Sequence, residues 1–349
     1  MAALVLAACS SSTDTTTEET TAPTTDVKVG LAYDIGGRGD KSFNDAAAAG
    51  LDRAISELGV TVNEVSATAG GAESEREDKL RLLAQSGYNP IIAVGFLYAG
   101  AVGKVAAEFP EIQFAIIDDA SVAAPNVASL VFAEEQGSYL AGVAAAKASK
   151  SGKIGYIGGV RIPLLQKFEA GFVAGVKATN AKATVDVKYV TEPPDFGGFN
   201  DPAKAKVIAN GMIDKGADVI YAAAGGSGKG LFEAAVAAAG AGKKVWTIGV
   251  DSDQYLTATP DEQMNMLTSM LKRVDVAVFD VIRAAVNGES VADDIGAGDG
   301  IQGRRYNLTN DGVGLSTSGG YLESEGLLDA VNAAAEAIKS GSITVPTAP

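Results

Sequence analysis

Histidine is absent from the 349 residues of this chain. Without an imidazole, the chain has no Ser–His or Cys–His nucleophile pair, no histidine general base and none of the usual zinc sites. Carboxylates are still available for acid–base chemistry, but the composition disfavours an enzyme. We therefore expect no catalytic residue, no metal and no cofactor.

Cysteine is almost absent too, because Cys9 is the only one. A single thiol excludes an internal disulfide and every multi-cysteine metal site. Cys9 ends the sequence Leu6-Ala7-Ala8-Cys9, which follows an apolar run and precedes a polar one. This arrangement resembles a bacterial lipobox, in which the cysteine is diacylated and becomes the mature N-terminus. Two lipid chains anchor a protein stably, so we expect a lipoprotein on the extracytoplasmic face of a cell membrane.

The residues around Cys9 divide into two expected segments. Residues 1–8 lack the basic region and the full apolar stretch of roughly 7–15 residues that a secretory signal needs, so we interpret them as part of a truncated signal peptide. Residues 9–25 consist largely of Ser, Thr and acidic residues. They contain too little apolar surface to fold, which predicts a lipid-anchored flexible tether.

Positive charge and long apolar runs are also scarce. Lys and Arg number 28 against 43 Asp and Glu, which gives a net charge of −15. Such a surface repels phosphate backbones, so we expect no nucleic-acid partner. No run after Cys9 supplies the roughly 20 apolar residues of a membrane-spanning helix. Hydrophobic residues still make up 47% of the chain, enough for a substantial core.

From Asp26 onward, strand and helix patterns alternate. Apolar residues at period two predict a strand at 27–33, and apolar residues at helical spacing predict a helix at 44–58. The same criteria predict strands or short apolar runs at 89–94, 114–117, 127–132, 153–159, 184–190, 218–224, 245–250 and 265–270, and helices at 98–109, 134–150, 164–177, 202–215, 229–239 and 272–286. Repeated βα units predict mostly parallel sheets flanked by helices.

The chain length suits two domains of roughly 150 residues each. The βα pattern restarts near residue 153, which predicts two similar lobes with a cleft between them. We assign residues 26–140 and about 260–299 to the first lobe. Residues 141–259 and about 300–349 are assigned to the second, although the pattern leaves the lobe of 300–349 open.

Ligands of open α/β sheets bind outside the carboxyl ends of the strands, so the residues after each predicted strand are candidates. These segments contribute carboxylates, polar Ser and Asn side chains, glycine turns, one ammonium group and one aromatic ring. The candidates are Asp34, Ser42, Phe43, Asn44, Asp118, Asp119, Gly226, Ser227, Asp251 and Lys272. Each aspartate alone is typical of a helix N-cap. Their joint placement favours a ligand rich in hydroxyl or N–H donors.

Phosphate binding is a poorer interpretation of the glycine turns. The segment 223–230 begins with alanine where a P-loop has its first glycine, and it ends with Gly230 where a P-loop has Ser or Thr. The carboxylates of Asp34 and Asp40 would also repel phosphate. Glycine turns that let a small ligand approach the backbone fit the sequence better.

Phe43 and Phe199 are aromatic residues in polar loops just before predicted helices. Either they pack beneath those loops, or they come from opposite lobes and clamp a flat ligand. Stacking of a base on an aromatic ring contributes roughly 1–3 kcal/mol.

Six of these segments, taken together, resemble the basic membrane protein family, whose best-understood type is the purine nucleoside receptor lipoprotein of ABC importers. They are D-x-G-x-x-x-D-x-SFN at 34–44, FAIID at 114–118, GGFNDPAKAK at 197–206, AAGGSGKG at 223–230, IGVDSDQ at 248–254 and TSMLKRVD at 268–275. The resemblance runs in order from about Val27 to Val345. It implies a two-lobe type I periplasmic-binding-protein-like fold, a purine nucleoside such as inosine, guanosine or adenosine in the cleft, and an ABC permease as partner. We expect a monomer.

The resemblance also implies roles for the candidate residues. Phe43 and Phe199 would sandwich the base, and Asn44 and Asp118 would hydrogen-bond its edge. Ribose would be held by Asp251 with help from Lys272 and the backbone of Gly226 and Ser227, while Asp34 and Ser42 would shape the first loop. Whether Asp118 or Asp119 faces the ligand is left open.

Two other functions stay open at this point. A nucleoside hydrolase or transferase would use the aspartates as base and nucleophile, although the chain lacks a dense acidic cluster of the form D-x-D-x-x-x-D-D. A sensor or surface lipoprotein would bind a ligand without supplying an importer.

Overall fold

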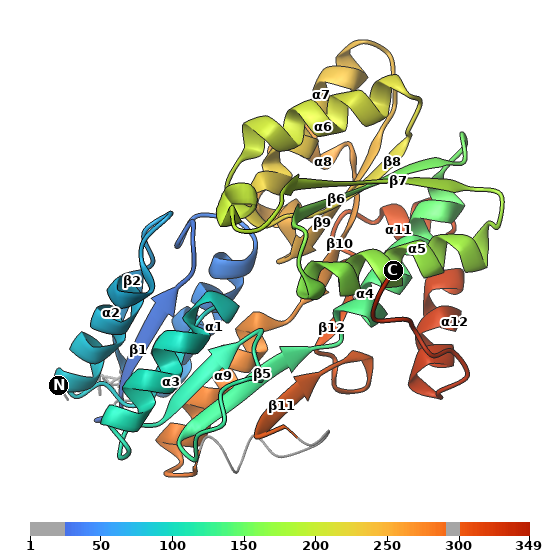
Figure 1. The fold of residues 1–349 in the computed structure, drawn as a ribbon. Helices are drawn as coiled ribbons and strands as arrows, with labels where there is room; N and C mark the ends of the chain where they lie inside the picture. Colours follow the sequence, from blue (N-terminus) through green and yellow to red (C-terminus); the bar gives the residue numbers. More distant parts are fainter. Residues whose placement is uncertain (1–24, 291–300) are drawn as a thin grey trace, which may run out of the picture.

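Two α/β lobes make up the described part of this computed structural model, residues 25–290 and 301–349 (Figure 1). Within these ranges each lobe contains one six-stranded sheet. The predicted fold class, two lobes with mostly parallel sheets flanked by helices, is confirmed. Cys9, the interpreted signal segment and the tether up to residue 24 lie outside the described residues. No helix in the described ranges is long and apolar enough to cross a membrane.

The first lobe has a fully parallel sheet in the order β11-β5-β4-β3-β1-β2. Helices α1 and α9 pack together against one side of this lobe, and α2 and α3 pack together against the other. The strands are β1 (Lys28–Tyr33), β2 (Thr61–Ser66), β3 (Ile91–Ala93), β4 (Phe114–Ile117), β5 (Val127–Phe132) and β11 (Gly303–Tyr306). The helices are α1 (Phe43–Leu58), α2 (Glu73–Gln85), α3 (Ala99–Glu108) and α9 (Val274–Val286).

The second lobe has the sheet order β12-β10-β9-β8-β6-β7, in which only β12 runs antiparallel to its neighbour. Helices α4, α5 and α12 cover one side, and α6 and α7 cover the other. The strands are β6 (Lys153–Val160), β7 (Thr184–Thr191), β8 (Val219–Ala223), β9 (Trp246–Asp251), β10 (Met266–Lys272) and β12 (Val313–Leu315). The helices are α4 (Glu134–Ala148), α5 (Pro163–Thr179), α6 (Pro202–Asp214), α7 (Lys229–Gly240), α8 (Pro260–Gln263), α11 (Tyr321–Ser324) and α12 (Leu328–Lys339).

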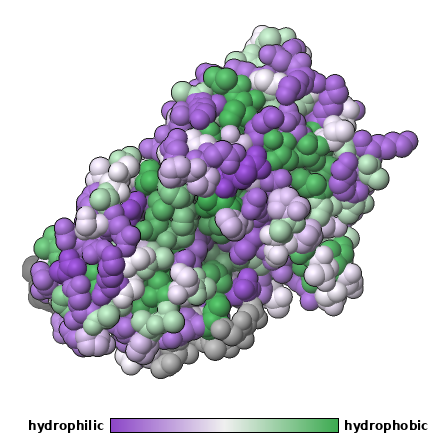
Figure 2. All heavy atoms as spheres, in the orientation of Figure 1, coloured by the Kyte–Doolittle hydropathy of each residue, from purple (hydrophilic) through white to green (hydrophobic). Residues whose placement is uncertain are grey.

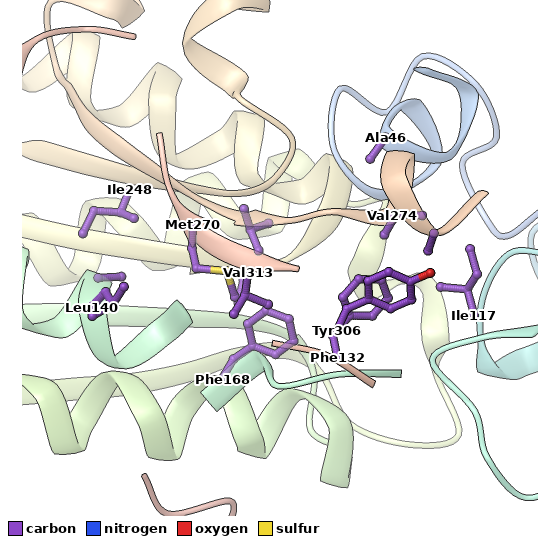
Figure 3. Packing of buried hydrophobic residues seen from close by; sticks show 14 of the residues in the cluster. Ala46, Ile117, Phe132, Leu140, Phe168, Ile248, Met270, Val274, Tyr306 and Val313 are labelled. Atoms are coloured by element: carbon purple, nitrogen blue, oxygen red, sulfur yellow. The ribbon is translucent and has the colours of Figure 1, made fainter. Parts of the chain in front are cut away.

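Three crossings of the chain join the lobes, from β5 to α4, from β10 to α9 and from β11 to β12. Near these crossings the buried core is continuous from one lobe to the other, as Figure 3 shows for Ile117, Phe132, Met270 and Val313. The rings of Phe132 and Tyr306, from neighbouring strands of the first lobe, stack with centroids 5.1 Å apart. The crossings therefore lie in packed structure, which leaves the far side of the cleft free to open.

The structure corrects our lobe boundaries at three elements. Strand β10, expected in the first lobe, pairs with β9 in the second, and only the following helix α9 returns to pack on α1. Strand β11 lies in the segment of about 300–349 that we assigned to the second lobe, but it pairs with β5 in the first. Helix α4 begins before residue 141 yet packs on α5 of the second lobe. An apolar strand needs neighbours on both sides, and its own pattern does not say which sheet supplies them.

Three elements of the first lobe had no counterpart among the predicted ones: β2, α2 and β11. Strand β2 is the edge strand of its sheet and buries none of its residues fully, so it lacks an apolar alternation. Helix α2 buries only Arg76, Leu80, Leu83 and Ala84 among many charged residues. Hydrophilic residues of this kind cover much of the face drawn in Figure 2, in keeping with the charged composition.

Candidate functional site

A cavity lies between the lobes at the carboxyl ends of both sheets. The space between its walls is about 570 Å³, including the part that is open to solvent. The first lobe contributes Asp34, Ile35, Asp40, Phe43, Asn44, Phe96 and Asp118, and the second contributes Leu164, Leu165, Phe168, Phe199, Ala223, Gly225, Val250, Asp251 and Lys272. Seven of the ten residues to which the family resemblance gives a role therefore line one cavity: Asp34, Phe43, Asn44, Asp118, Phe199, Asp251 and Lys272.

The loop between β1 and α1 is held in shape by Asp40. One of its carboxylate oxygens accepts from the backbone N–H groups of Ser42 (2.9 Å) and Asp45 (3.1 Å), and the other accepts from the N–H of Asn44 (2.9 Å). These donors belong to the first turn of α1 and have no partner within the helix. Asp40 thus caps α1 and fixes the direction in which Phe43 leaves the helix.

Asn44 is more tied to this loop than the sequence suggested. Its Oδ1 accepts from the backbone N–H of Asp34 (3.0 Å), and its Nδ2 donates to Asp40 Oδ2 (3.0 Å) and to the carbonyl of Ile35 (3.3 Å). The side chain both lines the cavity and holds the β1 end against α1. Asp34 accepts the N–H of Ile35 with one oxygen (2.8 Å) and also lines the cavity.

Ser42 connects the two lobes through Asp251. Its hydroxyl donates to Asp251 Oδ2 (2.6 Å) and lies 3.2 Å from the carbonyl of Val250, at the end of β9. In return the hydroxyl of Ser252 donates to the carbonyl of Ser42 (2.7 Å). Ser42 itself is fully buried and does not line the cavity. Its position accounts for how Asp251 is oriented.

Lys272 and Asp118 form an ion pair across the lobes. The Lys272 ammonium donates to Asp118 Oδ2, and the side chains of Lys272 and Asp118 are only 2% and 4% exposed. The second oxygen, Asp118 Oδ1, is buried and has no hydrogen-bond partner among the described residues. A buried acceptor without a donor is costly, and this one belongs to a residue of the cavity wall. Asp119 instead accepts from the N–H and hydroxyl of Ser121, so Asp118 is the carboxylate that faces the cavity.

Three aromatic rings surround the Lys272 ammonium. Its nitrogen lies 4.8 Å from the ring centroid of Phe43, 5.2 Å from that of Phe132 and 5.8 Å from that of Phe168. An ammonium within about 6 Å of a ring centroid is attracted to its face. The rings and Asp118 together hold Lys272 in a fixed position at the base of the cleft.

Phe43 and Phe199 reach the cavity from opposite lobes, as the clamp interpretation requires. Phe199 ends the short 3₁₀ helix η2 (Phe196–Phe199) and lies over the end of β6. A Cβ at Gly159 would lie 2.5 Å from Phe199 Cδ1, and one at Gly198 would lie 2.3 Å from the carbonyl oxygen of Gly159. Both glycines are therefore needed for the ring to lie where it does.

Gly226 and Ser227 do not line this cavity. The hydroxyl of Ser227 donates to the carbonyl of Gly198 (2.7 Å) and accepts from the N–H of Asp201 (2.7 Å), so it joins two loops of the second lobe. Gly226 borders a neighbouring hollow, and Gly225, with φ +57°, takes its place on the cavity wall. The sequence identified the right turn but not the residue of it that faces inward.

Several wall residues were not among the predicted ones. The apolar group Leu164, Leu165 and Phe168 belongs to α5, where helical spacing is indistinguishable from that of core residues. Phe96 follows β3, so the rule that identified the other strand-end residues would also have found it. From the sequence, Asp40 is identified only as a carboxylate that would repel phosphate and not as a residue of the cavity wall.

Burial dominates the electrostatics of the cavity. It raises the pKa of Asp34 to about 7, with Asp118 and Asp40 adding like charge, against the opposing N–H of Ile35 and the charge of Arg76. It also raises the pKa of Asp251 to about 6, although Lys272 and the Ser42 hydroxyl oppose the shift. Burial lowers the pKa of Lys272. The carboxylates of Asp118, Glu134 and Asp251 raise it by more, and the pKa therefore lies above its ordinary value.

The cavity thus holds four carboxylates and one ammonium group on its walls. Its aspartates accept hydrogen bonds, and its rings offer flat apolar surface. Within the described ranges no group of three or more carboxylate or thiol side chains is arranged to hold a metal ion. The arrangement suits a small flat molecule with several hydroxyl or N–H donors and no negative charge.

Two parallel-sheet lobes, three crossings and a cavity at the facing strand ends define a two-lobe solute-binding protein. A solved solute-binding protein of an ABC transporter from Aeropyrum pernix superposes with a TM-score of 0.76 at 30% identity, covering 92% of this chain and 93% of that one. The family described as ABC transporter substrate-binding protein PnrA-like matches residues 27–346. The chain belongs to this family, as the resemblance of its motifs led us to expect.

Curated relatives agree with this assignment. The chain is 36% identical to the CD4+ T-cell-stimulating antigen of Listeria monocytogenes, covering 99% of this chain and 95% of the relative. It is 34% identical to the ABC transporter nucleoside-binding protein BmpA of Lactococcus lactis, covering 93% and 90%. As a substrate-binding protein of an ABC system, the chain has a small-molecule ligand and a permease partner.

Proposed function

We propose that this protein binds purine nucleosides in its interlobe cavity and delivers them to the permease of an ABC importer. The observation that carries the proposal is the pair of rings, Phe43 and Phe199, on opposite walls of a cavity lined by carboxylates. A purine is flat on both faces and bears donors on its edge, and a ribose bears hydroxyls. The similarity to a nucleoside-binding relative supports the same ligand class.

The polar groups divide naturally between base and sugar. Asp251 is the proposed acceptor for ribose hydroxyls, because a carboxylate accepts two such donors at once. Asp118 Oδ1 is a buried acceptor in need of a donor, which an N–H of the base edge would supply. Hydrogen bonds to charged groups are worth roughly 1.5–3 kcal/mol net, so two or three of them make the ligand class selective.

The same carboxylates argue against phosphorylated ligands. Asp34, Asp40, Asp118 and Asp251 line the cavity, and the one wall ammonium, Lys272, is already paired with Asp118. A phosphate would bring further negative charge into a buried site that already carries an excess of it. Nucleosides are therefore the proposed substrates, and nucleotides are not. The site binds rather than transforms its ligand, so we propose no catalytic role for its aspartates.

The experiment that tests this proposal is a thermal-unfolding series with inosine, guanosine, adenosine, ribose and inosine monophosphate. A ligand that binds only the folded protein raises its melting temperature with concentration. We expect the three nucleosides to raise it, and ribose and the nucleotide to have little effect. Recovery of unchanged inosine afterwards distinguishes binding from hydrolysis. The absence of any shift with all three nucleosides would remove the proposal.

The lipid anchor at Cys9 is part of the proposal and has its own test. We expect Cys9→Ser to release the protein from the membrane fraction without changing its ligand affinity, since Cys9 belongs to the N-terminal segment and the cavity is built from residues 34–272. A variant that stays in the membrane fraction would show that the anchor lies elsewhere.

A further inference from the structure

The two lobes touch each other at several places around the cavity, and two of these contacts differ in chemistry. One contact is polar: Gln254 Nε2 donates to the carbonyl of Lys41 (2.9 Å), and Lys41 Nζ donates to the carbonyl of Thr257 (3.2 Å). The other contact is aromatic. The ring of Phe96 from the first lobe meets that of Phe196 from the second, with centroids 5.8 Å apart and planes at 62°.

The aromatic contact lies away from the hinge, the region where the three chain crossings join the lobes. Phe196 begins η2, which follows β7, and β7 is the edge strand of its sheet. The crossings that connect the lobes involve β10 and β12, at the opposite edge of the same sheet. When the lobes rotate apart about those crossings, points at the β7 edge move farthest. The Phe96–Phe196 contact is therefore among the first to break on opening.

Both rings are directly connected to groups that line the cavity. Gly95 precedes Phe96 and has φ +104°, and a Cβ there would lie 2.5 Å from Asp34 Oδ2, so the Phe96 turn packs against that carboxylate. Phe196 shares η2 with Phe199, which lies three residues on. Phe96 itself lines the cavity, whereas Phe196 does not. A ligand that positions Asp34 and Phe199 will therefore also position the two rings.

We propose that Phe96 and Phe196 form a latch that holds the lobes closed on the side away from the hinge and so sets how fast a ligand leaves. The proposal rests on the proposed function only in that the ligand occupies this cavity. Edge-to-face pairs add a modest attraction beyond the area that they bury, so we expect loss of the pair to speed release about 2- to 10-fold. Selectivity among purine nucleosides should stay unchanged, because Phe196 lies outside the cavity wall.

The test is a double-mutant cycle of Phe96→Leu, Phe196→Leu and the double variant in the full chain. Inosine release is measured by stopped flow, and the radius of gyration without ligand is measured by small-angle scattering. Tyr321→Leu is the matched control, since it disrupts an aromatic pair with Trp246 (centroids 4.9 Å) that lies wholly within the second lobe. Each latch variant should release inosine faster and be more open without ligand. The double variant should be no worse than the stronger single variant, and the control should behave as the wild type.

Two results would overturn the latch. If Phe196→Leu releases inosine at the wild-type rate while Phe96→Leu does not, Phe96 acts as an ordinary wall residue. If the two effects add without coupling, the rings act independently. A wild-type protein that binds no nucleoside would instead overturn the proposed function. In that case the scattering comparison still decides whether the rings hold the lobes together.

Discussion

The two walls of the cavity differ in character. The first lobe presents Asp34, Asp40, Asn44 and Asp118, whereas most of the second lobe's wall is apolar, with Leu164, Leu165, Phe168, Ala223 and Val250. The polar groups of the second lobe, Asp251 and Lys272, end two neighbouring strands, β9 and β10. Two similar βα lobes have thus acquired different surfaces at the same edge of their sheets. Similar folds fix where a site lies, and individual side chains fix what it recognises.

One feature is nonetheless shared by both walls. Asp118 just after β4 has φ +67°, and Asp251 at the end of β9 has φ +65°. A left-handed backbone at a non-glycine residue costs of order 1–3 kcal/mol and is retained where a function demands it. Each lobe therefore carries one strained aspartate at its strand ends, and the Lys272 ammonium pairs with the first of them and attracts the second.

The largest effect is expected from removing the charge that joins the walls. Lys272→Met leaves the Asp118 carboxylate buried without its partner, which should lower the free energy of unfolding by about 3–5 kcal/mol at neutral pH. Urea unfolding measures the change. The matched control is Lys104→Met: the Lys104 ammonium is exposed, so the loss of its ion pairs with Glu73 and Glu77 should cost far less than the loss of the buried pair. Equal losses in both variants would show that the buried pair has no special weight.

Each wall contributes one aromatic ring to the proposed clamp, Phe43 from the first lobe and Phe199 from the second. Phe43→Ala and Phe199→Ala should each weaken inosine, guanosine and adenosine by similar factors of about 5- to 150-fold, because stacking of roughly 1–3 kcal/mol does not depend on the atoms at the edge of the base. Titration calorimetry with each nucleoside measures the factors. A variant that weakens one nucleoside alone would mean that its ring reads the base edge rather than stacking on it.

Acidity tests the carboxylates of both walls. Asp251, with a pKa of about 6, accepts ribose hydroxyls in its ionised form, so affinity should fall as the pH drops below 6 and approach a loss of about tenfold per unit. In the ligand-free protein the sign is opposite. Because the pKa values of Asp34 and Asp251 are raised in the folded protein, the contribution of these two groups to stability is fully present below about pH 4 and is lost as the pH rises through about 6 to 7. Calorimetry and urea unfolding at matched pH values follow both trends. An affinity that rises toward pH 5 would contradict the ionised acceptor.

The second wall alone is tested by Asp251→Ala. This change should shrink the preference for inosine over hypoxanthine, because the group that rewards ribose hydroxyls is lost while the stacking rings remain. The preference should shrink because one or two hydrogen bonds from the ribose to a charged acceptor are lost, each worth roughly 1.5–3 kcal/mol. Removal of a buried charge partly offsets this loss. Calorimetry with both ligands measures it. Full retention of the preference would place the ribose contact on another residue.

The sequence was informative where local chemistry decides the structure. Buried parallel strands are apolar runs, and the site lies at their carboxyl ends, which led to Asp34, Asp118, Asp251 and Lys272. It failed where long-range packing decides. Which sheet receives β10 or β11 depends on partners far along the chain, and the apolar stripe of α5 that lines the cavity has the same spacing as a core stripe. The backbone of Gly226 and Ser227 was expected at the ribose, but Gly225 is the residue of that turn on the cavity wall, because contacts such as the Ser227 hydroxyl bonds to Gly198 and Asp201 set how the turn lies.

The central claim is that a purine nucleoside occupies the space between Phe43 and Phe199. The most direct measurement is a calorimetric titration of the wild-type protein with inosine, alongside the same titration of a variant that carries both Phe43→Ala and Phe199→Ala. The expected result is one molecule bound per wild-type chain and a greatly weakened or undetectable heat in the double variant. Equal binding by the two proteins, or no binding by the wild type at saturating inosine, would contradict the claim.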